Sequence, residues 1–255
     1  MDLGLEGKIA LVTGATKPNG LGKAIAVTLA EEGADVACLY HTNVAGARSI
    51  VEEIRAMGRR AIAIGADQSQ YEQVKDAIRS CQTELGPIDI LVNNAAMLGV
   101  FDYASAIDVS LWGQQVKVNL YGPFYWVRET FDFMVEKKWG RIISISSIAG
   151  TLGGFGQSSY SSSKGGLISL MKSIALEGAR FGITANALTL GWFDTDVTKR
   201  MKPDFQERFM KRIPLRMKGV PQDVADIVAF LASDRSRYIT GSNIVVDGGA
   251  SLFSV

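Results

Sequence analysis

Two side chains that can exchange a proton with a bound substrate, Tyr160 and Lys164, stand four residues apart, and Ser147 precedes Tyr160 by thirteen residues. On a helix, residues four apart lie on the same face, so the phenol and the ammonium would be neighbours. A phenol has an ordinary pKa of about 10, and a nearby ammonium favours the phenolate and lowers that pKa. These groups predict general acid–base chemistry at the oxygen of a carbonyl or an alcohol.

A glycine-rich segment near the N-terminus is typical of a nucleotide site. The stretch 13–22 follows an apolar run and leads into a helical pattern. Glycine lets the backbone approach a pyrophosphate, which the N-terminus of the following helix attracts. We therefore expect this loop to bind a dinucleotide. The candidate contacts are Gly14, Thr16, Lys17, Gly20, Leu21 and Gly22.

The end of the second apolar run bears on which dinucleotide binds. An acidic residue there would hold the ribose 2′-hydroxyl of NAD. The sequence instead reads Tyr40-His41-Thr42-Asn43, without an acid. Lys17, together with His41 and Thr42, could meet the 2′-phosphate of NADP. NADP(H) is therefore favoured over NAD(H), with Tyr40, His41 and Thr42 as candidate contacts.

His41 is the only histidine of the chain. A Ser-His-Asp hydrolase would have to use it as the base, and its place early in the chain argues against that role. No histidine cluster is left for zinc, so no metal site is expected.

Seven apolar runs alternate with helical patterns along the 255 residues. The runs predict strands at 9–12, 35–40, 61–65, 88–92, 141–145, 183–190 and 243–246. The periodicity between them predicts helices at 21–32, 44–58, 69–85, 107–136, 158–181 and 221–233. Such alternation predicts a three-layer α/β/α fold with a doubly wound, seven-stranded, mostly parallel sheet, the Rossmann fold.

No linker or repeat interrupts the chain, so residues 1–255 are expected to form a single domain. Residues 192–218 lie outside the alternation and carry Pro203 and Pro214, which predicts a substrate lid. This lid holds eight Lys or Arg residues against four acids. That surplus fits an anionic substrate, an acidic carrier protein or a solvated helix face.

The overall composition excludes several classes of partner. A formal net charge of +1 provides no general attraction for nucleic acid or for an anionic membrane. No apolar run approaches the roughly 20 residues of a membrane helix, and the N-terminus does not resemble a signal peptide. The only two cysteines, Cys38 and Cys81, fit a reducing compartment, so a cytoplasmic location is expected.

Further motifs follow the glycine loop in a fixed order. They are Asn93-Asn94-Ala95-Ala96, Val118-Asn119-Leu120-Tyr121-Gly122, Ser147, Tyr160-Ser161-Ser162-Ser163-Lys164, Leu190-Gly191-Trp192-Phe193-Asp194-Thr195 and Val246-Asp247-Gly248-Gly249. Together they resemble the classical short-chain dehydrogenases/reductases over essentially the whole chain. Within that family the chain looks closest to the 3-oxoacyl-[acyl-carrier-protein] reductases.

The resemblance implies a role for each member of the catalytic set. Tyr160 would act as the acid/base, and both Tyr160 and Lys164 would also bind the cofactor, Lys164 at the nicotinamide ribose. Ser147 would polarise the substrate oxygen. Asn119 would hold a water that relays protons between Lys164 and solvent.

The resemblance also implies contacts to the cofactor. Asp67 would contact the adenine ring, Asn93 and Ala95 would line the cofactor, and Thr195 would hold the nicotinamide carboxamide. The candidate walls of a substrate pocket are mostly apolar, as ligand sites usually are. They are Met97, Leu98, Leu152, Phe155, Gln157, Trp192 and Phe193.

The favoured function is an NADPH-dependent ketoreductase acting on a 3-oxoacyl thioester or a small ketone. An NAD-dependent alcohol or sugar dehydrogenase of the same fold is one alternative. A non-catalytic nucleotide-sensing protein is another, against which the complete catalytic set argues. Family members are commonly tetramers built through the two long helices and the last strand, so a homotetramer is expected. A carrier protein would dock near Lys137, Lys138 and Arg180.

The chain departs from the family pattern at three places. Five residues, rather than three, separate Gly14 from Gly20, Ala96 stands where a glycine is usual, and Leu190 replaces a proline. Enoyl reductases of the wider group also have longer glycine loops. However, they place six residues between the tyrosine and the lysine, whereas three separate Tyr160 from Lys164. This spacing favours carbonyl chemistry.

Overall fold

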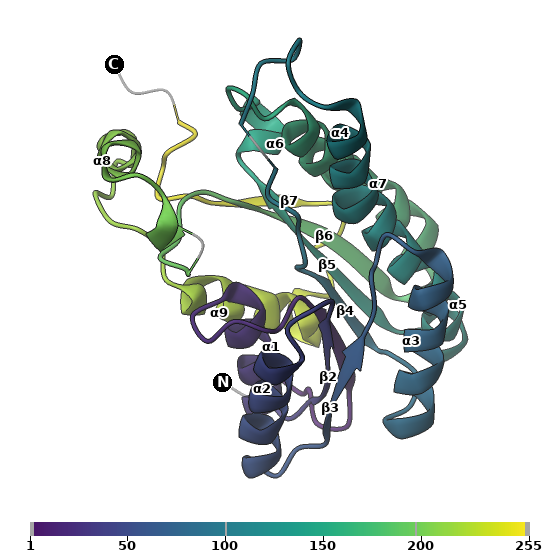
Figure 1. The fold of residues 1–255 in the computed structure, drawn as a ribbon. Coiled ribbons are helices and arrows are strands. Elements are labelled where there is room, and N and C mark those ends of the chain that lie inside the picture. Colours follow the sequence, from purple (N-terminus) through teal and green to yellow (C-terminus); the bar gives the residue numbers. More distant parts are fainter. Residues whose placement is uncertain (1–2, 100, 197, 253–255) are drawn as a thin grey trace.

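A seven-stranded parallel sheet forms the centre of the computed structural model, which describes residues 3–99, 101–196 and 198–252 (Figure 1). The strand order is β3-β2-β1-β4-β5-β6-β7. The strands are β1 Ile9–Thr13, β2 Asp35–Tyr40, β3 Ala61–Gly65, β4 Ile90–Asn93, β5 Gly140–Ser147, β6 Ile183–Leu190 and β7 Asn243–Val246. The predicted doubly wound fold is confirmed. The strand order reverses between β1 and β4, the point at which such sheets bind ligands.

Each face of the sheet is covered by a layer of helices (Figure 1). One layer contains α1 Leu21–Glu31, α2 Val44–Ala56 and α9 Pro221–Ala232. The other contains α3 Tyr71–Glu84, α5 Gly122–Lys137 and α7 Ser158–Gly178. Alternate residues of β1 enter the two cores: Ala10 and Val12 pack under α1 and α9, whereas Ile9 and Leu11 pack under α3 and α5. Burial on both faces explains why the strands read as continuous apolar runs.

The predicted long helix 107–136 is divided into three parts. Helix α4, Val109–Val116, is followed by a π-helical turn, Lys117–Tyr121, and then by α5. Pro123 near the start of α5 has no N–H for the carbonyl of the residue four positions earlier. The wider turn absorbs this mismatch, and it brings the side chain of Asn119 fully into the interior.

The lid segment contains a short 3₁₀ turn, Thr198–Arg200, and helix α8, Pro203–Arg212. Figure 1 shows α8 standing outside both helical layers. A further short helix, α6 Ala149–Leu152, connects β5 to α7. Among the described residues, no helix is both long and apolar enough to cross a membrane.

Candidate active site

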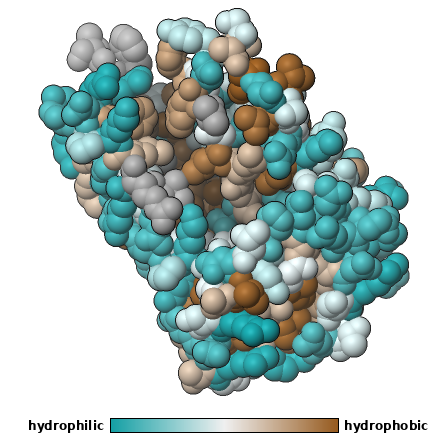
Figure 2. Space-filling view, in the orientation of Figure 1, coloured by the Kyte–Doolittle hydropathy of each residue, from teal (hydrophilic) through white to brown (hydrophobic). Residues whose placement is uncertain are grey.

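A cavity of about 1040 Å³ opens beyond the carboxyl ends of the strands. Figure 2 shows it as a hollow in one face, with apolar side chains inside and hydrophilic side chains around it. The loops after β1, β2, β4, β5 and β6 all contribute to its wall. This edge of the sheet therefore brings together residues that are far apart in the sequence.

Most of the predicted site residues line this cavity. From the catalytic set these are Ser147, Tyr160 and Lys164. From the cofactor set they are Gly14, Thr16, Lys17, Gly20, Leu21, Gly22, Tyr40, His41, Thr42, Asp67, Ala95 and Thr195. From the substrate set they are Met97, Leu98, Leu152, Phe155, Gln157, Trp192 and Phe193. Asn93 and Asn119 lie outside the cavity wall.

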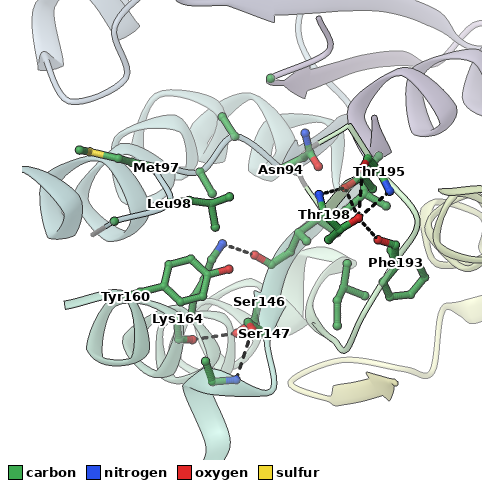
Figure 3. Close-up of a pocket in the computed structure, with 18 of the residues that line it drawn as sticks. Asn94, Met97, Leu98, Ser146, Ser147, Tyr160, Lys164, Phe193, Thr195 and Thr198 are labelled. Carbon is green, nitrogen blue, oxygen red and sulfur yellow. Dashed lines mark hydrogen bonds between the residues drawn. The ribbon is translucent and has the colours of Figure 1, made fainter. Parts of the chain in front are cut away.

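The catalytic residues come from two adjacent elements. Ser147 ends β5, and Tyr160 and Lys164 share one face of α7 (Figure 3). Ser147 and Tyr160 both line the cavity, and the Ser147 hydroxyl is near enough to the phenol to lower its pKa. The Lys164 ammonium, which is buried, donates to the carbonyl of Ile145 at 2.7 Å and lies 5.8 Å from the centre of the Tyr160 ring. A carbonyl oxygen beside Ser147 and Tyr160 would meet two hydroxyl donors.

Burial, rather than the lysine, has the largest effect on the acidity of the tyrosine. Desolvation raises the pKa of Tyr160 above its ordinary value, and the neighbouring Ser147 hydroxyl lowers that pKa in part. Burial also lowers the pKa of Lys164 to about 8. The Lys164 ammonium is itself buried and donates to the Ile145 carbonyl, so the expectation that it lowers the tyrosine pKa stays a prediction.

The lowered pKa of Lys164 predicts a pH dependence. Below about pH 8 the side chain is an ammonium, and above it a neutral amine. Only the ammonium attracts the phenolate that remains after Tyr160 has given up a proton. We therefore expect kcat for ketone reduction to be level below about pH 8 and to fall above it. Stopped-flow rates measured from pH 5.5 to 10 test this. A rate that rises through pH 8 would show that the neutral amine is the active form.

Asn119 does not contact the cavity. Its carboxamide oxygen accepts from the backbone N–H of Met97 at 2.7 Å, and its amide group donates to the Met97 carbonyl at 3.0 Å and to Ser163 at 3.3 Å. These bonds join the π-helical turn to the loop after β4 and to α7. The side chain thus positions Met97 and α7, and the predicted water relay through Asn119 stays a prediction.

The structure places Asn94, rather than Asn93, at the cavity. Asn93 is the last residue of β4, and its buried amide donates to the hydroxyl of Ser144 at 3.1 Å. The side chain of Asn93 is thus turned away from the cavity, and its predicted contact with the cofactor stays a prediction. Asn94 lines the cavity and donates to the Thr13 carbonyl at 2.7 Å. The alternation of side chains along a strand is the signal that separates the two asparagines.

The glycine loop fits a dinucleotide because its glycines allow close backbone packing. Gly14 has a φ of +74°, and a Cβ atom there would lie 3.0 Å from Ala95 Cα. A Cβ on Gly22 would lie 2.6 Å from the Gly14 carbonyl oxygen and 2.7 Å from the amide nitrogen of Asn94. This tight turn aims the N-terminus of α1, which begins at Leu21, at the cavity.

The adenosine end of the cavity combines basic and acidic groups. Lys17, Tyr40, His41 and Thr42 line it together, and His41 Nε2 lies 4.0 Å from a carboxylate oxygen of Asp67. Next to them, the amide of Asn43 donates to the Thr16 carbonyl at 2.8 Å, which fastens the glycine loop to the start of α2.

The lengthened glycine loop is bonded to the lid segment through one residue, Asn19. The side-chain amide of Asn19 donates to the Asp194 carbonyl at 3.2 Å. Its backbone N–H donates to the Asp196 carboxylate at 3.3 Å, and its carbonyl accepts from the Asp196 N–H at 3.4 Å. Thr198 closes the following turn by donating to the Phe193 carbonyl at 2.6 Å (Figure 3). The longer loop therefore holds the first part of the lid against the nucleotide end.

The substrate side of the cavity is aromatic. The ring of Trp192 lies 4.5 Å from that of Phe209 and 5.5 Å from that of Phe205, measured between centroids. Phe205 and Phe209 belong to α8 and line the cavity, as Arg212 does. Sequence reasoning missed these three residues, although the spacing of four and three residues along a helix could have grouped them.

The fold and the site together define a Rossmann-fold oxidoreductase that depends on a nicotinamide nucleotide. Residues 14–251 match a family model described as enoyl-(acyl carrier protein) reductase. The chain is 38% identical over 242 residues to the 3-oxoacyl-[acyl-carrier-protein] reductase FabG of Staphylococcus epidermidis, covering 95% of this chain and 98% of that protein. The corresponding FabG of Escherichia coli is 38% identical over 247 residues, covering 97% and 98%. The chain belongs to the short-chain dehydrogenase/reductase family, as predicted.

Solved structures agree with this membership. A candidate gluconate dehydrogenase from Agrobacterium tumefaciens superposes with a TM-score of 0.94 at 30% identity and covers 100% of both chains. A candidate short-chain alcohol dehydrogenase from Sinorhizobium meliloti superposes with a TM-score of 0.92 at 35% identity and covers 98% of both. The protein is thus an NAD(P)-dependent oxidoreductase acting on a carbonyl/alcohol pair.

Proposed function

We propose that this protein is an NADPH-dependent ketoreductase whose substrate is a 3-oxoacyl thioester or a small ketone. The observation that carries the proposal is that Ser147, Tyr160 and Lys164 line the same cavity as the glycine loop. The similarity to 3-oxoacyl-[acyl-carrier-protein] reductases supports the same chemistry.

The catalytic residues act on the substrate oxygen. When bound, the nicotinamide supplies or accepts the hydride. Ser147 donates to the carbonyl oxygen and holds it beside Tyr160, which gives its phenolic proton to that oxygen. Ser147 and the Lys164 ammonium then stabilise the phenolate. In the opposite direction, the Tyr160 phenolate takes the proton of the alcohol.

The preference for NADPH is supported by the nucleotide end of the cavity. Lys17 and His41 line it, and the residues at and after the end of β2, Tyr40 to Asn43, include no acid that could hold a ribose 2′-hydroxyl. Asp67 is the acidic residue nearest to this group, and it lies beside His41. Lys17, His41 and Thr42 are the residues that would hold a 2′-phosphate.

An NAD-dependent sugar dehydrogenase is the second candidate, favoured by the similarity to the candidate gluconate dehydrogenase. The decisive experiment has two parts. Initial rates of reduction are measured with NADPH and with NADH, on an N-acetylcysteamine 3-oxoacyl thioester and on simple ketones. Rates of gluconate oxidation are measured with NADP⁺ and with NAD⁺. We expect kcat/KM with NADPH to exceed that with NADH by about tenfold or more, as one charge-assisted contact allows. Preference for NADH together with gluconate oxidation would establish the second candidate. An absence of turnover with every substrate would favour a nucleotide sensor.

Three further assignments belong to this proposal. We propose a cytoplasmic homotetramer in which residues 192–218 act as a lid. Free, buried cysteines at 38 and 81 support a reducing compartment. Exposed apolar side chains on the two long helices, Phe124 on α5 and Leu176 on α7, support contact between copies. If the rate measurements identify an acyl thioester as the substrate, we expect a carrier protein to dock near Lys137 and Arg180.

A further inference from the structure

One face of helix α8 forms part of the cavity wall on the substrate side. Phe205, Phe209 and Arg212 are separated by four and three residues, which places them on the same face of the helix. All three line the cavity. An arginine thus continues a stripe of aromatic residues that faces a ligand site.

The other two basic side chains of α8, Arg208 and Lys211, form contacts within the helix itself. Lys211 pairs with Glu207 at 2.8 Å, one turn away. Arg208 donates to the backbone carbonyl of Asp204 at 3.2 Å. Among the described residues, no carboxylate forms an ion pair with Arg212. Of the lid's basic residues whose side chains are described, Arg212 is the one that reaches the cavity wall.

The remaining charged groups of the cavity are accounted for at other positions. Lys17, His41 and Asp67 belong to the nucleotide end, and Asp196 is bonded to the glycine loop. The Lys164 ammonium is buried against the Ile145 carbonyl. These assignments leave the Arg212 guanidinium as the cation available to a substrate.

Trp192 provides an independent sign that this wall meets a ligand. Its side chain lines the cavity with 6% of its surface exposed, and its buried indole N–H finds no acceptor among the described residues. A buried donor without a partner costs about 1–3 kcal/mol, so such groups are usually satisfied. An acceptor oxygen on a substrate would satisfy it.

Apart from the carboxamides of Gln114 and Gln157, the rest of the substrate side offers few free polar groups. Gln115 is already bonded, because its oxygen accepts from Ser159 and its nitrogen donates to the Met97 carbonyl. The neighbouring walls are apolar at Met97 and Leu152. These apolar walls fit an apolar substrate body better than a polyhydroxy compound such as a sugar, whose hydroxyls each need a partner.

We propose that the substrate is a carbonyl compound with an apolar body and an anionic group, in which the body lies among Trp192, Phe205 and Phe209 and the anion pairs with Arg212. This assignment rests on the proposed ketoreductase function and narrows its substrate class. In this arrangement one basic residue of the lid, Arg212, binds the anionic group of the substrate. The indole N–H of Trp192 would donate to an oxygen of the same substrate.

The test uses matched pairs of substrates. Methyl ketones that carry a terminal carboxylate, at several chain lengths, are compared with their neutral N-methyl amides under NADPH. For the wild-type protein we expect kcat/KM to favour the carboxylate of the best length by about tenfold or more, the worth of one charge-assisted contact. Arg212→Gln should bring that ratio close to one by lowering kcat/KM for the carboxylates. Arg212→Lys should keep part of the preference.

Two further variants make the test specific. Arg208→Gln removes the same charge from the outer face of α8 and should leave the ratio as in the wild type. Trp192→Phe keeps an aromatic ring and removes the indole N–H donor. It should raise KM for the carboxylate substrate several-fold, with kcat close to that of the wild type. A wild-type ratio near one, or a preference that survives Arg212→Gln, would overturn the proposal. Turnover of the neutral amides shows that the ketoreductase itself is intact, so a failure of the proposed function is recognised separately.

Discussion

Replacing Tyr160 by phenylalanine is expected to lower kcat for ketone reduction by about a thousandfold, within the range that a positioned general acid contributes. The substitution removes the phenolic hydroxyl, which lies near Ser147, and leaves the ring in the cavity wall. Because Tyr160 gives its proton to the substrate oxygen, the loss falls on the chemical step. Single-turnover measurements with NADPH and an accepted ketone separate that step from binding.

Two comparisons support the interpretation of this variant. Titration of NADPH fluorescence should give a dissociation constant close to that of the wild type, because the fold and the glycine loop are unchanged. Tyr238→Phe removes the same hydroxyl from a fully exposed residue and should leave kcat as it is. If Tyr160→Phe retained wild-type turnover, another group would have to be the proton donor.

Adding one methyl group at Gly22 is expected to damage both cofactor binding and stability. The new Cβ would lie 2.6 Å from the Gly14 carbonyl oxygen and 2.7 Å from the amide of Asn94, so the turn between β1 and α1 would have to open. Overpacking of this kind costs about 1–3 kcal/mol. We expect Gly22→Ala to lower the free energy of unfolding by that amount, and to weaken NADPH binding by about tenfold to a hundredfold.

The matched control for this prediction is Gly113→Ala. Gly113 lies in α4, and a Cβ atom there would meet nothing within 4 Å. Since alanine favours a helix over glycine, this variant should be more stable by about 0.5–1 kcal/mol and should bind NADPH normally. Urea unfolding and fluorescence titration measure both quantities. Normal NADPH binding by Gly22→Ala would place the dinucleotide away from this loop.

The limits of sequence reasoning appear most clearly at the end of β4. Adjacent asparagines stand at positions 93 and 94, and the resemblance assigned the cofactor contact to the first. In the fold, Asn93 completes the strand and bonds to Ser144 across the sheet, and Asn94 faces the cavity. The residue at which β4 ends decides which asparagine faces the cavity, because successive side chains of a strand point to opposite faces of the sheet.

The long helix 107–136 shows a second limit. Its periodicity is helical throughout, and Pro123 is compatible with the first turn of a helix. The π-helical turn at Lys117–Tyr121 arises because the chain continues through the proline rather than ending before it. That turn carries Asn119 into contact with Met97 and Ser163, a contact that local patterns do not reveal.

By itself, the sequence determined the order of strands and helices, the glycine loop and the pairing of Tyr160 with Lys164 on one helix face. These features depend on periodicities of two and 3.6 residues, or on residues a few positions apart. Only the tertiary structure decided the raised pKa of Tyr160, the lowered pKa of Lys164, the bonds of Asn19 to the lid and the approach of Arg212 to the cavity. Desolvation and side-chain direction are set by elements that are distant in the sequence, and neighbouring residues alone do not encode them.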